Sequence, residues 1–167
     1  IYNAADIDIQ NSTFTENTAS DGKGGAIYND ASAVGFTMKK NTFTGNKAKY
    51  GNAIYNAGEI ETLSSTFKQN VNNDLNTAGG AIYNEGEMVF ASTAVAESEL
   101  TMENNYARSA TASFGGAIFN GKDKSSPLFS VKEFGNTCIM YSMDKILEYG
   151  DAINIIQVLP NSFTENN

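Results

Sequence analysis

The sequence lacks histidine and tryptophan altogether, and its 167 residues include only one cysteine and two prolines. The absence of histidine excludes the commonest general base, the usual serine and cysteine triads, and nearly every zinc, copper or haem site. Cys138 has no second cysteine to pair with, so it is interpreted as a small core residue. These absences favour a protein with no catalytic residue, no metal site and no cofactor.

Positive charge is also scarce, because ten lysines and Arg108 stand against 19 acidic residues and give a formal net charge of −8. A nucleic-acid-binding protein needs a basic surface to displace counterions from phosphates, so nucleic acid is excluded as a partner. The chain has no run of 18 apolar residues that could span a bilayer. We therefore expect a segment that is not embedded in a membrane.

Asparagine, by contrast, supplies 21 of the 167 residues, and a bias of this kind is typical of an internal repeat. The motif Gly-Gly-Ala-Ile-Tyr-Asn, or a close copy, begins at Gly24, Gly51, Gly79 and Gly115, with a degenerate copy at Gly150. A second motif, Phe-x-x-Asn, alternates with the first and begins at Phe14, Phe43, Phe67 and Phe163, while Met102 occupies the same place in one unit. The chain is therefore a tandem array with a core period of about 27 residues.

The composition of each unit selects the architecture. Helical repeats need long stretches of good helix formers, whereas these units are rich in Gly, Asn, Ser, Thr and β-branched residues. Short alternating segments such as 7–10, 36–39 and 60–62 indicate about three short strands per unit. The sequence predicts an all-β parallel β-helix of about five to six coils, with regular repeats over 1–120 and a divergent continuation of the same β-helix over 121–167.

This fold assigns a place to each repeated residue. Stacked coils would bring equivalent side chains into columns about 4.8 Å apart, with an inward isoleucine column, an inward phenylalanine column and two hydrogen-bonded asparagine ladders. We expect the asparagines to adopt the left-handed αL conformation, and the second position of Gly-Gly to require it as well. The predicted structural columns contain Ile27, Ile54, Ile82 and Ile118; Phe14, Phe43 and Phe67; Asn29, Asn56, Asn84 and Asn120; and Asn17, Asn46, Asn70 and Asn105.

The residue between Ile and Asn is aromatic in each motif. Alternation places it on the face opposite to Ile, together with Ala26 in the first copy, so we expect an exposed aromatic column made of Tyr28, Tyr55, Tyr83 and Phe119. Such a column could stack against a sugar or a partner surface, and it is the predicted binding face. The alternative interpretation is that these rings simply cover the sheet.

Gly-Gly-Ala-Ile-Tyr-Asn alternating with Phe-x-x-Asn resembles the polymorphic outer membrane protein repeat, as found in the passenger domains of autotransporter adhesins and in adhesin-like surface proteins. The match covers 24–29, 43–46, 51–56, 67–70, 79–84 and 115–120, and it lapses over 121–149. The resemblance implies a right-handed parallel β-helix displayed outside the cell and used for adhesion. Because the sequence begins and ends inside copies of the motifs, at Ile1-Tyr2-Asn3 and after Phe163, we also expect it to be an internal fragment of a longer array, which would explain why it shows no signal peptide.

Three functions remain open at this stage. The first is a non-catalytic, adhesin-like stalk whose partner is a protein or glycan on a host or neighbouring cell. The second is a structural subunit of an extracellular filament or sheath that self-associates through its coil ends. The third is a polysaccharide-acting enzyme, which is disfavoured because acidic pairs such as Asp6 with Asp8 are dispersed and are interpreted as solvated faces. The insertion 91–100 is the expected specialised loop.

Overall fold

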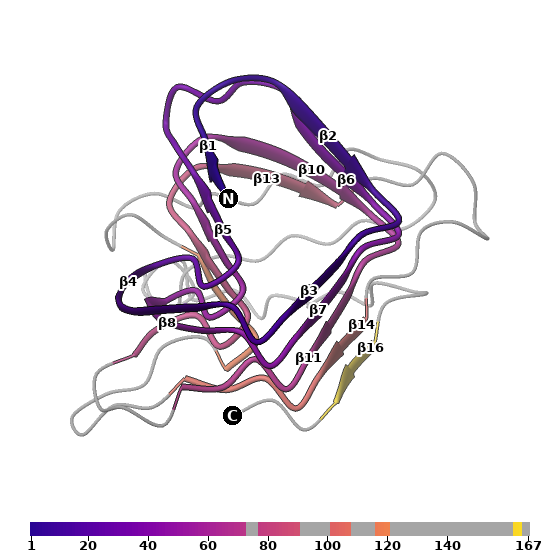
Figure 1. Cartoon of the computed structure of the whole chain (residues 1–167). Coiled ribbons are helices and arrows are strands. Elements are labelled where there is room, and N and C mark those ends of the chain that lie inside the picture. The colour runs from indigo at the N-terminus through magenta and orange to yellow at the C-terminus, as the bar shows by residue number, and fades with distance from the viewer. Residues whose placement is uncertain (73–76, 91–100, 108–115, 121–161, 165–167) are drawn as a thin grey trace, which may run out of the picture.

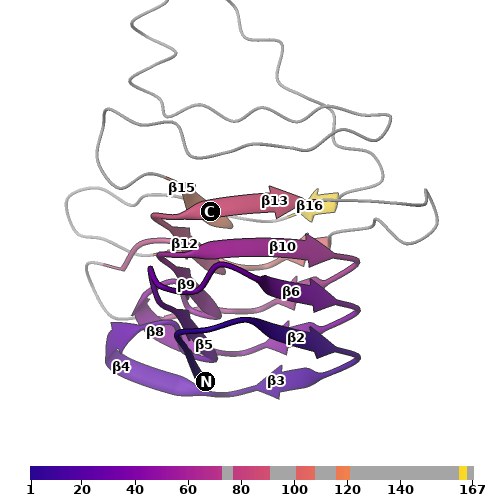
Figure 2. The same cartoon turned by 90° about the horizontal axis from the view of Figure 1, so that it is seen from above.

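A computed structural model describes residues 1–72, 77–90, 101–107, 116–120 and 162–164. This described part consists of short strands and contains no helix. The strands of one coil pair in parallel with the equivalent strands of the next, and the coils stack along one axis without closing into a barrel (Figures 1 and 2). The predicted parallel β-helix is therefore confirmed. The number of coils and the division at residue 120 stay predictions.

Three sheets form the sides of a triangle when the molecule is viewed along its axis (Figure 1). Sheet A contains β1 (Tyr2–Asn3), β5 (Ile27–Asn29), β9 (Ile54–Asn56), β12 (Ile82–Asn84) and β15 (Ile118–Asn120). Sheet B contains β2 (Ile7–Gln10), β6 (Phe36–Lys39), β10 (Glu59–Leu63) and β13 (Glu87–Phe90). Sheet C contains β3 (Thr13–Thr15), β7 (Thr42–Thr44), β11 (Thr66–Lys68), β14 (Thr101–Glu103) and β16 (Ser162–Thr164).

A fourth element, which the sequence did not predict, protrudes beside sheet A (Figure 1). It consists of β4 (Thr18–Lys23) and β8 (Lys47–Tyr50), which pair in parallel with a register shift between Ala19 and Lys23. We call this pair the arm. Each coil therefore has up to four strands rather than three, because the polar segment between Phe-x-x-Asn and Gly-Gly is also extended.

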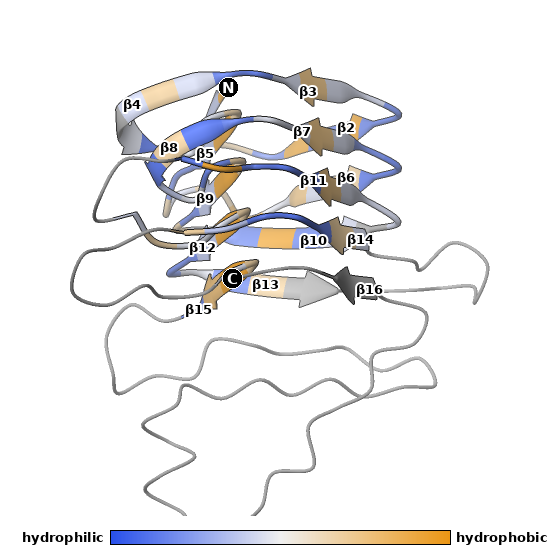
Figure 3. Ribbon diagram, turned by 90° about the horizontal axis from the view of Figure 1, so that it is seen from below, coloured by the Kyte–Doolittle hydropathy of each residue, from blue (hydrophilic) through white to orange (hydrophobic). Residues whose placement is uncertain are grey.

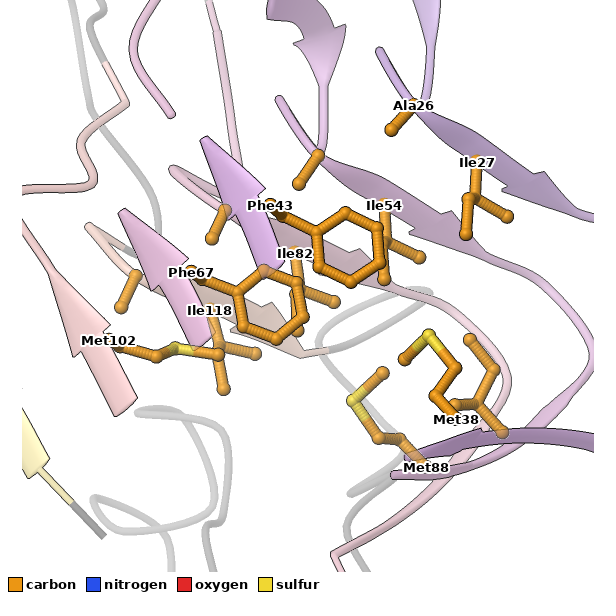
Figure 4. Close-up of a cluster of buried hydrophobic side chains, with 14 of the residues drawn as sticks. Ala26, Ile27, Met38, Phe43, Ile54, Phe67, Ile82, Met88, Met102 and Ile118 are labelled. Carbon is orange, nitrogen blue, oxygen red and sulfur yellow. The ribbon is translucent and has the colours of Figure 1, made fainter. Parts of the chain in front are cut away.

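The core lies between the three sheets and is built from columns of side chains (Figure 4). Ile27, Ile54 and Ile82 are each 0% exposed on sheet A. On sheet C, the ring centroids of Phe43 and Phe67 are 4.7 Å apart with nearly parallel planes. The apolar residues of successive coils recur at the same places along the strands (Figure 3). Since fully burying one such side chain contributes about 1.5–3 kcal/mol, the columns supply the main driving force for stacking.

One residue of the isoleucine motif lies elsewhere than predicted. Ala26 is only 4% exposed and belongs to the same core cluster as Ile27, so it does not lie on the outer face with Tyr28. The reason is that β5 begins at Ile27, and Ala26 belongs to the corner before the strand, where the alternation of a strand does not apply.

An asparagine ladder follows sheet A along the axis. In each step, the side-chain amide nitrogen of one asparagine donates to the side-chain oxygen of the next, over 2.6–2.7 Å. The ladder runs through Asn3, Asn29, Asn56, Asn84 and Asn120. The same amides also donate to backbone carbonyls, as from Asn56 to Glu87, so they satisfy the turn that leaves each strand.

A second ladder lies at the corner after sheet C and runs through Asn17, Asn46, Asn70 and Asn105. The Asn70 oxygen accepts from both the backbone and the side-chain nitrogen of Asn46, at 3.0 and 2.9 Å. Its amide nitrogen donates to the Phe43 carbonyl at 3.0 Å and to the Asn105 oxygen at 2.8 Å. One buried side chain thus bonds to the coil before it and to the coil after it.

The predicted αL conformation falls one residue earlier than expected at this corner. Positive φ angles occur at Glu16, Gly45, Gln69 and Asn104, each of which directly precedes a ladder asparagine. Positive φ is uncommon for residues other than glycine. Its recurrence at this position marks a sharp bend of the backbone in each of these coils. The asparagine after the bend has no positive φ, and its amide is turned inward to a buried carbonyl, as Asn70 is to that of Phe43.

The prediction for the glycine pair was also wrong. The first glycine has the positive φ, at +63° in Gly51, whereas the second position does not. At Gly25, the second position, a Cβ would collide with the backbone oxygen of Asn52 in the next coil. Asn52 is the exception at this position, because its side chain is turned into the interior, where it accepts from Ala48 and donates to the carbonyl of Gly80 at 2.8 Å.

Further buried asparagines complete the polar interior, and sequence reasoning missed them because they do not recur in every unit. Asn41 accepts from the backbone nitrogen of Ser12 at 2.9 Å and donates to the carbonyl of Ile9 at 2.7 Å. Asn72 donates to the carbonyl of Ala48 at 3.0 Å. The degenerate motif at Gly150, the insertion 91–100 and Cys138 lie outside the described residues.

Replacing Asn70 by alanine is expected to lower the free energy of unfolding by about 3–5 kcal/mol, because several buried donors and acceptors lose their partner at once. The matched control is Asn17→Ala at the exposed end of the same ladder, with an expected loss below about 1 kcal/mol. Urea denaturation followed by circular dichroism measures both. Equal losses in the two variants would contradict the importance of the ladder.

Candidate functional site

An aromatic column follows the outer side of sheet A, on the face opposite to the isoleucine column. Its members occupy equivalent positions in paired strands, and neighbouring ring planes lie within 7° of parallel in the tyrosine part. The ring centroids there are 5.2–5.3 Å apart. The column consists of Tyr2, Tyr28, Tyr55, Tyr83 and Phe119, so the structure brings the four predicted binding-face residues together and adds Tyr2.

The rings stack on one another, and this determines what they can contact. Each inner ring has a neighbour on both faces, so a sugar cannot stack on those faces. Exposure differs strongly along the column, from 68% for Tyr2 to 1% for Tyr55. The expectation of an exposed aromatic face is therefore wrong for Tyr55, while Tyr28, Tyr83 and Phe119 are partly exposed. Ring edges and hydroxyl groups are what the column can offer to a partner.

The arm is what covers the middle of the column. The Lys23 ammonium lies 4.1 Å from the ring centroid of Tyr55 and donates to its hydroxyl oxygen at 2.6 Å. Tyr50, which pairs with Lys23 in register, packs edge-on against Tyr83 at 5.3 Å. The ammonium is held at the hydroxyl end of the ring by this hydrogen bond and is attracted by the electrons of the ring, so Lys23 fixes the arm to the column.

Carboxylates accept from two of the hydroxyls. The Tyr55 hydroxyl donates to Glu85, and the Tyr2 hydroxyl donates to Asp30 over 2.9 Å. Lys23, Tyr55 and Glu85 thus form a charged and hydrogen-bonded cluster that joins the arm to two coils of sheet A. The sequence analysis missed Lys23 and Glu85 because neither residue recurs in the other units. The available signal was their position, because Lys23 directly precedes one copy of the motif and Glu85 directly follows another.

The ionisation of the column is suppressed. Burial, and then the hydrogen bond to Glu85, raise the pKa of Tyr55 well above its usual range. Burial, and then the charge of Glu85, raise the pKa of Tyr83 to about 12. Asp30 behaves oppositely, because hydrogen bonds from Ser32 and then from Tyr2 lower the pKa of its carboxyl group. At neutral pH the column therefore consists of neutral phenols, with the ionised carboxylate of Asp30 beside Tyr2, an arrangement suited to hydrogen bonding.

Two other outward faces could meet a partner. On sheet B, Glu59 lies in register with Glu87, and a shallow depression there is lined by Val34, Thr37 and Glu61 as well as by these two carboxylates. Among the residues that the structure describes, no three acidic or cysteine side chains are arranged to hold a metal ion.

The outward face of sheet C carries threonines in two columns, and these columns include Thr13 with Thr42 and Thr15 with Thr44. Lys68 and Glu103 continue the second column and form an ion pair of 2.9 Å. The face is therefore hydroxyl-rich, and the two charges within its second column compensate one another.

Alkaline pH is expected to destabilise the fold through the column. The pKa of Tyr83 is raised from 10.0 to about 12, which means that the folded state favours the neutral phenol. The stability gained in this way is fully present below pH 10 and is lost as the pH rises through about 12. Urea denaturation at a series of pH values between about 8 and about 12 should show this decline. Tyr83→Phe keeps the stacking and should reduce the decline without changing the stability at neutral pH. An unchanged alkaline decline in this variant would contradict the assignment.

A comparison with known protein families finds a match to part of the chain. Residues 11–30 match the family model of the Chlamydia polymorphic membrane protein repeat. The matched segment contains one Phe-x-x-Asn motif and one Gly-Gly-Ala-Ile-Tyr-Asn motif, with β3, β4 and β5. No curated protein and no solved structure matches the chain.

The family is one of surface and outer membrane proteins, which supports a cell-surface location in general. Within the described residues, no helix has the length and apolar character needed to cross a membrane. The resemblance indicated by the two motifs is confirmed over residues 11–30, where one copy of each motif is similar to the Chlamydia polymorphic membrane protein repeat.

Proposed function

We propose that this chain is part of a non-catalytic extracellular surface protein, an adhesin-like β-helical stalk that presents an outward face to a glycan or protein on another cell. The proposal draws on the repeat family and on the division of labour among the residues. The side chains that repeat most faithfully are buried: Ile54 and Phe67 pack in the apolar core, and Asn70 is hydrogen-bonded to the next coil. They maintain a long, regular scaffold, and the side chains between them are the ones available for contact.

The single observation that carries the proposal is the outward face of sheet C. Its threonine hydroxyls repeat from coil to coil at the spacing of paired strands, which is about 4.8 Å. A hydroxyl both donates and accepts, so an ordered array of hydroxyls can match the hydroxyls of a glycan. Sheet B is less suitable, because the carboxylates of Asp8, Glu61 and Glu87 would repel the acidic surfaces of cells.

The test couples the 167-residue chain to fluorescent beads and measures their capture by a glycan array and by cell monolayers. Thr44→Arg on the sheet C face is expected to reduce capture about tenfold or more, because a bulky cation breaks the hydroxyl array. The matched control is Thr37→Arg on the neighbouring strand β6, which faces outward from sheet B. Capture by this control should equal that of the unchanged chain.

Several outcomes would contradict the proposal. Equal losses in the two variants would mean that sheet C is not the binding face, and no capture by any glycan or cell would exclude adhesion. Depolymerisation of a polysaccharide by the purified chain would point to an enzyme. Axially stacked copies in electron micrographs, with no capture, would favour the alternative of a filament subunit.

A further inference from the structure

The tyrosines of the aromatic column are close and aligned with one another. Tyr2 and Tyr28 have ring centroids 5.3 Å apart and planes 5° from parallel, and Tyr28 and Tyr55 have values of 5.2 Å and 5°. Both pairs are in register on adjacent parallel strands, so each ring repeats the placement of its neighbour. The ring carbons next to the hydroxyl of one tyrosine therefore lie near those of the next, and bond formation requires the rings to rotate about their side-chain bonds from the stacked arrangement toward an edge-to-edge one.

The surroundings of Tyr2 favour its oxidation. The hydrogen bond between its hydroxyl and Asp30 is exposed to solvent, so a dissolved oxidant can reach the phenol. Its hydroxyl donates to the Asp30 carboxylate at 2.9 Å. A phenol that loses an electron becomes a strong acid, and a hydrogen-bonded carboxylate can take up the proton in the same step. Tyr28, the neighbour of Tyr2, is also partly exposed.

The surroundings of Tyr55 have the opposite effect. Its ring is 1% exposed, and the Lys23 ammonium lies 4.1 Å from the ring centroid. A nearby positive charge opposes removal of an electron from the ring. Close packing also opposes the rotation that bond formation requires. The column is therefore divided into a reactive pair, Tyr2 with Tyr28, and a protected middle.

We propose that Tyr2 and Tyr28 form an oxidative cross-linking site, at which a one-electron oxidant of the peroxidase class joins the two rings by a carbon–carbon bond. Each phenol gives one electron to the oxidant and loses its hydroxyl proton, in Tyr2 to Asp30 and in Tyr28 to solvent. The two radicals combine at the carbons next to the hydroxyls. The ring hydrogens at those carbons then leave as protons while both oxygens are reprotonated, so the net loss is two electrons and two protons.

The product is a covalent link between neighbouring coils. A disulfide cannot form within this chain, because it contains a single cysteine. A link between Tyr2 and Tyr28 would close a loop of one coil and would reduce the entropy of the unfolded chain, as a disulfide does. The inference does not depend on the proposed adhesive function.

The test uses the dilute 167-residue chain with tris(bipyridine)ruthenium(II), persulfate and a brief light flash as the oxidant. Trypsin separates the two tyrosines into peptides 1–23 and 24–39, while Tyr55 lies in 50–68. Mass spectrometry should detect the first two peptides joined, with two hydrogens fewer than their sum, and dityrosine fluorescence should appear. The yield should be about tenfold higher in the folded chain than in urea, because folding aligns the rings. The midpoint of thermal unfolding should rise in the cross-linked monomer.

Two variants separate the site from general reactivity. Tyr2→Phe keeps the stacking and should abolish the link, and Asp30→Asn should lower its yield several-fold by removing the proton acceptor. Tyr50→Phe is the matched control, because Tyr50 touches the column edge-on at Tyr83, and it should leave the yield unchanged. Equal yields in urea, links only between separate chains, or a predominant link between Tyr55 and Tyr83 would each overturn the proposal.

Discussion

The structure depends on how the corners of each coil satisfy their backbone. A parallel β-helix must turn its chain sharply several times in every coil, and the carbonyl and amide groups at these turns point partly inward, away from water. An unpaired buried group of this kind costs about 1–3 kcal/mol, which would accumulate with every coil. The side-chain amides of residues such as Asn46 and Asn70 remove this cost, because each bonds both to its neighbours in the ladder and to a backbone group. The apolar columns can then stack without leaving polar groups unsatisfied.

The same arrangement explains the division between scaffold and surface. Ladder asparagines and core isoleucines or phenylalanines must face inward in every coil, so they repeat in the sequence. Outward positions carry no such constraint, and they differ between coils, as Thr44 and Lys68 do at one register position of sheet C. The proposed stalk would need this combination of a uniform interior and a variable exterior. It can extend its length by adding coils while the surface adapts to different partners.

The period of the sequence was enough to predict the parallel β-helix, because in stacked coils each copy of the repeated motif occupies an equivalent place and packs against the copies before and after it. Residues that recur could be assigned to columns for the same reason. The αL positions at the corner after sheet C were misplaced by one residue, since a motif such as Gln69-Asn70 does not reveal which of its residues bends. The ladder asparagines of sheet A, such as Asn56, have no positive φ, so the αL prediction was wrong for them. The cover over Tyr55 could not be predicted either. Lys23 and Glu85 occur once, and only the folded chain brings them to the same ring.

The ladders bond equivalent asparagines of adjacent coils regardless of how many residues separate them in the sequence. Asn46 and Asn70 are bonded although only 24 residues separate them, and Asn84 and Asn120 are bonded across 36. This difference in length leaves the bonds between the amides and the stacking of the apolar columns unchanged in the described residues. Insertions and deletions are therefore tolerated between ladder positions and opposed at them. A surface protein built in this way can acquire or lose a loop in a single evolutionary step while the coils above and below remain in register.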